Sequence, residues 1–382
     1  MNAASRVPTD SKSYFQGTHR TRPPEATWDW IEPRLQTVGV TRLADVTALD
    51  RLGIPVFQAI RPGSRNLSVS QGKAVTREGA RVSAAMEAVE LWHAECLDHL
   101  PQVSSSLREM ELGNAIPSET FSWRPDSRRL SATPFPWIEA RSLLDGPNGW
   151  LLRQMVEVDF TLPNQLTPLM FHVTSNGLAS GNTLEEARLH ALCEVVERHG
   201  LYLARKEPQR LRPLDPSSVE VPFCRELLDR VADAGMKLAL YDITWEIGVP
   251  VVIADVVASD LPNVWRGSGA HPEPAVALSR ALTEAAQARL TYIAGARDDL
   301  MPFRTVKHVG EVFETFREPE TSHRFEDLPS LATPRLDEDL ERILECFETL
   351  GFKPYEVDLS REDLGVPVVS IFVPGFKEAA YG

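Results

Sequence analysis

Two stretches of the chain carry glutamates three residues apart within apolar, helix-forming sequence. Glu87 and Glu90 lie in SAAMEAVELWHAE, and Glu194 and Glu197 lie in LHALCEVVER. Residues i and i+3 project from one face of a helix, and a helix that is apolar nearly all round is buried. Solvated surface pairs are the alternative for any such spacing. Buried carboxylates this close repel each other unless they are paired or bind a metal, so the pattern favours a divalent cation site, Mg²⁺ if phosphates share it.

The two glutamate pairs belong to an internal repeat. Residues 76–90 and residues 183–197 both read T-x-x-x-A-R-x-x-x-A/L-x-E-x-x-E, and each follows a Gly/Ser/Asn-rich loop. A weaker third copy, RALTEAAQ at 280–287, places Glu284 and Gln287 on one helix face. Glu186 precedes Glu194 by about two helical turns and lies near the same face. The repeat predicts several carboxylates converging from different helices.

Two basic residues accompany the carboxylates. Arg198 follows Glu197 directly and can donate two hydrogen bonds to one anion, and Lys73 lies in the loop before the first helix. The loop SQGKAVT lacks the G-x-x-x-x-G-K-[ST] pattern, so the chain is not a P-loop NTPase. The combination favours a nucleotide-polyphosphate site. An unrelated two-metal hydrolase is the alternative, but the Asp and His ligands usual in such sites are missing, and the nearby histidines are interpreted as core or surface residues: His93, His172, His190 and His199.

Strands alternate with helices along the chain, which indicates an α/β or α+β protein. Helices are expected at 77–97, 184–205, 274–297 and 336–350. Strands are expected at 54–60, 135–140, 168–174, 238–244, 249–258, 353–358 and 366–373. Residues 61–76 and 175–183 are expected to be loops, and 100–150 and 301–335 loop-rich insertions.

Composition narrows the function classes. The chain has 382 residues, 43% of them hydrophobic, and a net charge of −14. That charge repels nucleic acids and anionic membranes. There is no secretory h-region, no apolar run long enough for a membrane helix and no C-x-x-C pair among the four cysteines. These features predict a cytoplasmic protein with a disordered stretch at 1–12 and one domain at 13–382.

The repeat also resembles a known family. SVSQGKAVTREGARVSAAMEAVELWHAE and TSNGLASGNTLEEARLHALCEVVERHG are similar to the two signature blocks of the YcaO superfamily, and RALTEAAQARLTYIAGARDD to its third block. The opening KSYFQGTHR and the run GVTRLADVTALDRLGIPVFQAIRPGSR resemble the YcaO subgroup encoded beside a TfuA partner. The resemblance covers roughly residues 12–375. It implies a fold of mixed sheets with repeated strand–loop–helix units and an ATP site without a P-loop.

The resemblance assigns roles to residues of this chain. It implies metal binding by Glu87, Glu90, Glu194 and Glu197, and catalytic roles for Arg198 and Lys73. It implies nucleotide contacts from Lys73, Ser83, Asn182, Glu186, Arg198, Gln287 and Arg289, with Arg297 as the alternative to Arg289. The chain departs from the family at two positions: Ala74 replaces a glycine of the G-K-G turn, which is a small change, and Ala179 replaces a serine, which removes a hydroxyl there, with Ser180 beside it.

The family is thought to phosphorylate a peptide amide oxygen with ATP and Mg²⁺ after a nucleophile has attacked the amide carbon. External sulfide gives a thioamide, whereas a Cys, Ser or Thr side chain gives an azoline. Azoline-forming members usually end in P-x-P-x-P, whereas this chain ends VPGFKEAAYG, so thioamide formation with a TfuA-like partner and a sulfide donor is expected. Azoline formation and a non-catalytic ATP-binding accessory role are the alternatives. A precursor peptide or protein substrate and a homodimer are also expected.

Overall fold

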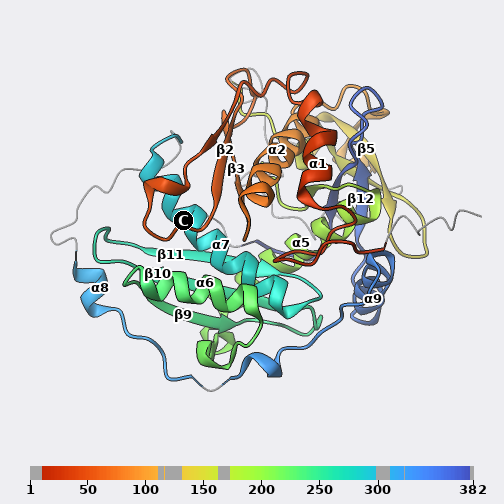
Figure 1. The fold of residues 1–382 in the computed structure, drawn as a ribbon. Helices are drawn as coiled ribbons and strands as arrows, with labels where there is room; N and C mark the ends of the chain where they lie inside the picture. The colour runs from red at the N-terminus through yellow and green to blue at the C-terminus, as the bar shows by residue number, and fades with distance from the viewer. Residues whose placement is uncertain are drawn as a thin grey trace, which may run out of the picture.

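Three antiparallel sheets surround the centre of the protein in a computed structural model that describes residues 11–110, 116, 131–161, 173–297, 310–321 and 323–378. In Figure 1 the sheet of β1–β3 lies above, the sheet of β8–β11 below, and the largest sheet to the right. The first sheet has the order β1-β2-β3, formed by Arg42–Asp45, Val56–Ile60 and Val69–Lys73. The second has the order β11-β10-β9-β8, formed by Val264–Ala270, Val251–Val257, Lys237–Asp242 and Arg212–Leu214.

The third sheet joins the middle and the end of the chain. Its order is β4-β5-β12-β13-β7, and β6 pairs with β5. These strands are Gln102–Ser106, Pro134–Ser142, Tyr355–Asp358, Val368–Phe372, Leu178–Ser180 and, for β6, Gly149–Leu152. The α-helices of the described residues are α1 (Pro24–Ile31), α2 (Arg77–Ala94), α3 (Leu107–Met110), α5 (Leu184–Lys206), α6 (Pro222–Asp233), α7 (Pro274–Ala294), α8 (Glu311–Thr315) and α9 (Leu336–Thr349). Among these residues, no helix combines the length and the hydrophobicity needed to cross a bilayer.

The four long helices expected from the sequence are confirmed, but two expected loops contain strands. β3 lies within 61–76 and β7 within 175–183. Their Ser, Gln, Gly and Ala residues have low intrinsic strand propensity, and the pairing of β3 with β2 and of β7 with β13 stabilises them instead. Residues 168–172 of an expected strand lie outside the described residues, and 173–174 are not in a strand.

The internal repeat is three strand–helix units, β3–α2, β7–α5 and β11–α7. Each helix begins at an N-cap whose side chain accepts a backbone N–H: Thr76, Thr183 and Glu273. Each strand also approaches its own helix closely. A Cβ on Gly72 would lie 2.3 Å from the Ala80 oxygen, and one on Gly269 would lie 2.3 Å from the Ala277 oxygen. These matching contacts show that the third copy, the weakest in sequence, has the same close strand–helix approach as the first.

The three units form a closed ring. α2 packs on the strand of the next unit, β7; α5 packs on β11; and α7 packs on β3. Equivalent glutamates make two of the three joints. Glu90 of α2 accepts hydrogen bonds from the Ser180 N–H and Oγ, at 2.9 and 2.7 Å. Glu197 of α5 accepts them from Ser268 Oγ and the Ala270 N–H, at 2.7 and 3.1 Å.

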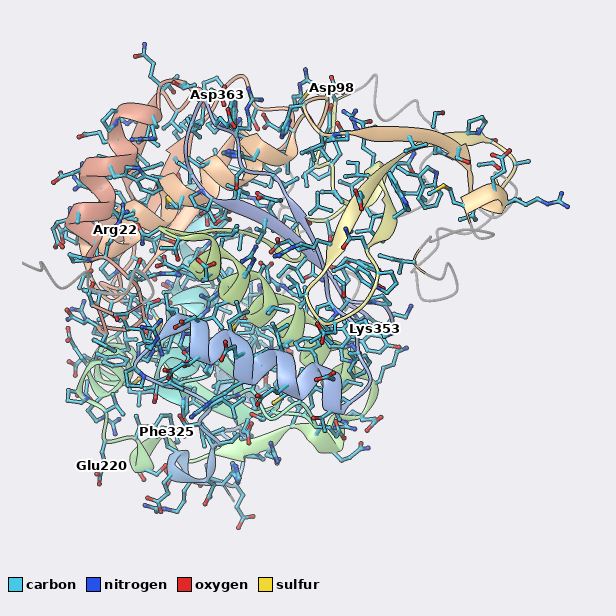
Figure 2. All side chains as sticks on the ribbon, turned by 90° about the vertical axis from the view of Figure 1, so that its right-hand side faces the viewer. Arg22, Asp98, Glu220, Phe325, Lys353 and Asp363 are labelled. Atoms are coloured by element: carbon cyan, nitrogen blue, oxygen red, sulfur yellow. The ribbon has the colours of Figure 1, made fainter. Side chains whose placement is uncertain are left out.

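The segment before α1 lies against this ring. Figure 2 shows Arg22 at the base of α1, and α9 lying over α5. Lys12 and Asp339, at the start of α9, form a salt bridge of 2.5 Å in which neither side chain is exposed. This corrects the disorder expected for residues 11 and 12, while residues 1–10 lie outside the described part of the chain. The segment is fixed at Lys12 by a partner at the other end of the chain.

Candidate functional site

A cavity of about 890 Å³ lies where the three units meet. All three helices of the repeat face it, together with strands β3, β7 and β11 and the segment before α1. Its acidic and basic lining residues are Arg20, Arg22, Lys73, Glu87, Glu90, Glu186, Glu194, Glu197, Arg198, Arg266, Arg280, Glu284 and Arg297, and His190 lies among them. The convergence of carboxylates from different helices, which the repeat predicts, is therefore confirmed.

Three of these carboxylates titrate near neutral pH. Burial raises the pKa of Glu87 and that of Glu90 to about 7, and it raises the pKa of Glu194 to about 8. Repulsion between neighbours adds to the effect: Glu87 raises the pKa of Glu90, and Glu90 and Glu197 raise that of Glu194. A cation in the cavity would remove this repulsion and favour the ionised forms.

Two other carboxylates are held by hydrogen bonds from the protein. Glu197 forms the joint with β11 and is 3% exposed. Glu186, also 3% exposed, accepts from the Thr21 N–H and Oγ1 and from the Asn182 side chain at 2.9 Å. Arg20 lies 3.5 Å from Glu186. Glu186 therefore connects the segment before α1 to α5.

Cationic groups lie among the carboxylates. Lys73 at the end of β3 forms an ion pair of 2.8 Å with Glu284 of α7, which closes the third joint of the ring. Burial alone would raise the pKa of Glu284, but the Lys73 ammonium together with Arg198 and Arg280 outweighs burial, and the pKa is lowered. Arg198 lies 3.8 Å from Glu194 and 3.9 Å from Glu197. The positions of Lys73 and Arg198 suit the charge of a polyphosphate.

Ten of the eleven site residues predicted above line the cavity: Lys73, Ser83, Glu87, Glu90, Asn182, Glu186, Glu194, Glu197, Arg198 and Gln287. Arg289 does not. It is two residues after Gln287, about 200° around the helix, and its guanidinium pairs with Asp50 at 2.9 Å and Asp260 at 2.6 Å. The alternative, Arg297, lines the cavity. Arg20, Arg22, Arg266 and Arg280 line the cavity without being predicted, although Arg280 stands in the third copy about one helical turn before Glu284.

The chemistry of the lining fits Mg²⁺ held together with phosphates. Among the described residues, no three His, Cys, Asp or Glu side chains already form a metal cluster. Mg²⁺ usually takes one or two carboxylates and completes its shell with phosphate oxygens and water, so carboxylates spread around a wide cavity suit it. Glu87, Glu90 and Glu194, whose repulsion a cation relieves, are the residues that fit this role. The Gln287 Oε1 is buried without a partner, which leaves an acceptor for a ligand donor.

Three of the four histidines near the motifs lie among the described residues, and each contacts other protein groups. His93 Nδ1 lies 2.8 Å from the Val89 oxygen, and burial lowers its pKa to about 4. His199 contacts the Phe376 ring in a stacked geometry at 4.4 Å. His172 lies outside the described residues. His190 contacts Arg280 at the cavity wall.

Curated relatives align with this chain over most of its length. A protein of Mycobacterium tuberculosis is 37% identical over 373 residues, which are 95% of this chain and 83% of the relative. One of Methanothermobacter thermautotrophicus is 35% identical over 93% of this chain and 94% of its own length. One of Rhizobium leguminosarum bv. trifolii, named for its position in the tfuA 3′ region, is 40% identical over 73% of this chain and 68% of its own.

Solved structures share the fold. The YcaO protein of Methanopyrus kandleri, bound to AMPPCP and Mg²⁺, superposes with a TM-score of 0.77 at 27% identity, covering 97% of this chain and 95% of that one. A heterocyclase in complex with substrate and cofactor gives a TM-score of 0.75 at 21% identity; the alignment covers 98% of this chain but only 54% of the heterocyclase.

A family model matches residues 71–377, which include the three units except the first two residues of β3, and its description is "YcaO cyclodehydratase, ATP-ad Mg2+-binding". The matched range contains every carboxylate of the cavity lining. The likeness to the nucleotide-bound structure agrees with this description. The chain belongs to the YcaO family and binds ATP and Mg²⁺.

Proposed function

We propose that this protein activates a backbone amide of a peptide or protein with ATP and that the product is a thioamide. The observation that carries the proposal is the single cavity in which Glu87, Glu90 and Glu194 meet Lys73 and Arg198. ATP supplies the phosphoryl group that turns the amide oxygen into a leaving group, and Mg²⁺ neutralises the charge of the phosphates. Lys73 and Arg198 hold positive charge at the cavity wall, where a transferring phosphoryl group needs it.

In the proposed reaction, sulfide replaces the amide oxygen. Hydrosulfide attacks the amide carbon and forms the C–S bond, and the amide oxygen takes the γ-phosphoryl group of ATP. The C–O bond then breaks, so the oxygen leaves within inorganic phosphate together with one proton, and ADP is released. The protein's contribution is to position the reactants and stabilise charge rather than to supply a nucleophile.

The choice of thioamide rests on two likenesses. The opening KSYFQGTHR resembles the subgroup encoded beside TfuA, and the Rhizobium relative is named for the tfuA 3′ region. The proposed partners are therefore a TfuA-like protein and a sulfide donor, and the substrate is a precursor peptide or protein. Azoline formation is the second candidate, favoured by the likeness to a heterocyclase.

Product analysis tests the proposal. The protein is mixed with ATP, Mg²⁺, sulfide, a TfuA-like partner and candidate peptides, and the peptide mass is measured. Replacement of oxygen by sulfur, absent when ATP or sulfide is omitted, is the expected result. Loss of one water without need of sulfide would identify an azoline instead. Full ATP binding with neither turnover nor mass change would leave only the accessory role.

A further inference from the structure

A second, very small cavity adjoins the 890 Å³ cavity. The larger one is called the nucleotide cavity, because the proposed function places ATP there. It measures about 10 Å³, which is near the smallest space that holds one water molecule. Its lining includes His19 from the segment before α1, His190 and Cys193 from α5, and Arg280 from α7. His190 and Arg280 also line the nucleotide cavity, so they separate the two spaces.

Three buried atoms on these residues have no hydrogen-bond partner: His19 Nδ1, His190 Nδ1 and Arg280 Nε. A buried polar atom left unpaired destabilises a protein, and a native structure pairs nearly all of them with protein or with ordered water. All three atoms belong to residues that line the small cavity. One water could therefore satisfy the three together.

The hydrogen-bonding roles of the three atoms are complementary to a water. Arg280 Nη2 lies 3.0 Å from His190 Nε2. A guanidinium only donates, so His190 Nε2 accepts and the proton of the neutral ring is on Nδ1. His190 Nδ1 and Arg280 Nε are then donors, and His19 Nδ1 can accept. A water accepts two hydrogen bonds and donates the third.

We propose that one ordered water in this cavity joins His19, His190 and Arg280, and that His190 with this water positions the Arg280 guanidinium at the nucleotide cavity. His190 and Arg280 occupy the same position in their units, as does Ser83 in the first, so all three face the centre of the ring. His190 is a positioning residue, because it acts on bound ligand through Arg280.

Both histidines are neutral, as this arrangement requires. Burial lowers the pKa of His190 well below its usual value, and the neighbouring Arg280 and Arg20 lower it further. Burial also lowers the pKa of His19 to about 4.

Three variants of His190 test the positioning role. A Gln side chain can place its amide oxygen near the position of Nε2, whereas Asn reaches only the position of Nδ1 and Leu offers no acceptor. The affinity for a non-hydrolysable Mg–ATP analogue is measured by calorimetry, with thermal unfolding followed in parallel. We expect His190→Gln to bind nearly as tightly as the wild type, and His190→Asn and His190→Leu to lose about tenfold, the loss of one hydrogen bond to a charged group. Equal losses in all three variants, or none in His190→Leu, overturn the proposal.

Filling the small cavity tests the water. Cys193→Val adds volume there, whereas Cys193→Ala leaves room for a water and serves as the matched control. We expect Cys193→Val to lower both the unfolding temperature and the nucleotide affinity, because it leaves three polar atoms unpaired, and Cys193→Ala to retain the affinity. A more stable Cys193→Val protein with unchanged affinity would show that the cavity is dry. Neither test uses peptide, sulfide or a partner, so the proposed thioamide activity can fail without affecting them.

Discussion

Glu87, Glu90 and Glu194 combine burial with mutual repulsion, and both oppose ionisation. Burial raises their pKa values to about 7, 7 and 8. A cation binds the ionised form, so binding has to release the protons that remain. Proton release is therefore a direct measure of these residues as ligands.

We expect the affinity for a Mg–ATP analogue to rise between about pH 6 and pH 8.5, by up to about tenfold per pH unit for each proton released. The stability of the ligand-free protein changes in the opposite sense. Because the folded-state pKa values are raised, the unfolded chain loses these protons first, and stability falls as pH rises from about 4.5 towards 8. Calorimetry in buffers of different ionisation enthalpy measures the released protons. Affinity independent of pH over this range would contradict the assignment.

The substitution Glu194→Gln should have different effects on the stability of the protein and on its affinity for nucleotide. The substitution removes a carboxylate whose charge is destabilised by burial, so the ligand-free protein should unfold at the same temperature or higher near pH 8. Its affinity for the Mg–ATP analogue should fall by about tenfold or more, as for lost metal-site groups. Glu226→Gln on the surface of α6 is the matched control and should change neither. Unchanged affinity in Glu194→Gln would exclude Glu194 as a ligand.

The sequence predicts most of the lining because E-x-x-E spacing sets two carboxylates on one helix face. It misplaces Arg289 because proximity in sequence to Gln287 does not mean the same side of the helix. It misses Arg20 because no periodic pattern connects a segment before the first helix to a glutamate in α5. Side chains contributed by irregular segments leave no such signal.

At the scale of elements, the units depend on the close approach of strand and helix. A Cβ on Gly72 would lie 2.0 Å from the Ala84 nitrogen as well as 2.3 Å from the Ala80 oxygen. At the equivalent position the second unit has Ala179, which is fully buried. The sequence shows the helices of the repeat through their helix-forming composition and shared motif, but β3 and β7 are short and contain residues of low strand propensity, and only their tertiary pairing defines them.

Gly72→Ala should therefore separate β3 from α2. We expect it to destabilise the protein by about 1–3 kcal/mol or more, the range for overpacking, because the clashing atoms belong to the backbone. Gly63→Ala is the matched control: nothing lies within 4 Å of a Cβ there. Chemical denaturation of both variants gives the free energies of unfolding. Equal free energies of unfolding for the two variants would show that β3 and α2 can move apart without destabilising the protein.

At the scale of the whole molecule, distant parts of the chain converge on the cavity. The salt bridge between Lys12 and Asp339 joins side chains 327 residues apart. No local pattern could reveal it, which explains why disorder was expected up to residue 12. Part of the acidic excess behind the net charge of −14 lies inside the protein, because several glutamates face the cavity rather than the outer surface.

Lys12→Met should release the segment that lines the cavity before α1. It leaves Asp339 buried without its cation, and breaking a buried pair in this way costs about 3–5 kcal/mol. The double variant Lys12→Met, Asp339→Asn removes the unpaired charge and should recover part of the stability. We expect the single variant to be cleaved faster by protease near its N-terminus and to bind nucleotide more weakly. Stability and affinity equal to the wild type would show that the segment is held by other contacts.

The closed ring has a consequence for the lifetime of the protein in a cell. Side chains of the cavity lining take part in each joint between units, so a nucleotide that fills this cavity would lie against all three units. Ligand binding adds about 2.7 kcal/mol of stability at a hundredfold excess over the dissociation constant. Depletion of cellular ATP would remove this contribution from all units together and increase the unfolded fraction available to proteases. We therefore expect the abundance of the protein to fall when cellular ATP is depleted.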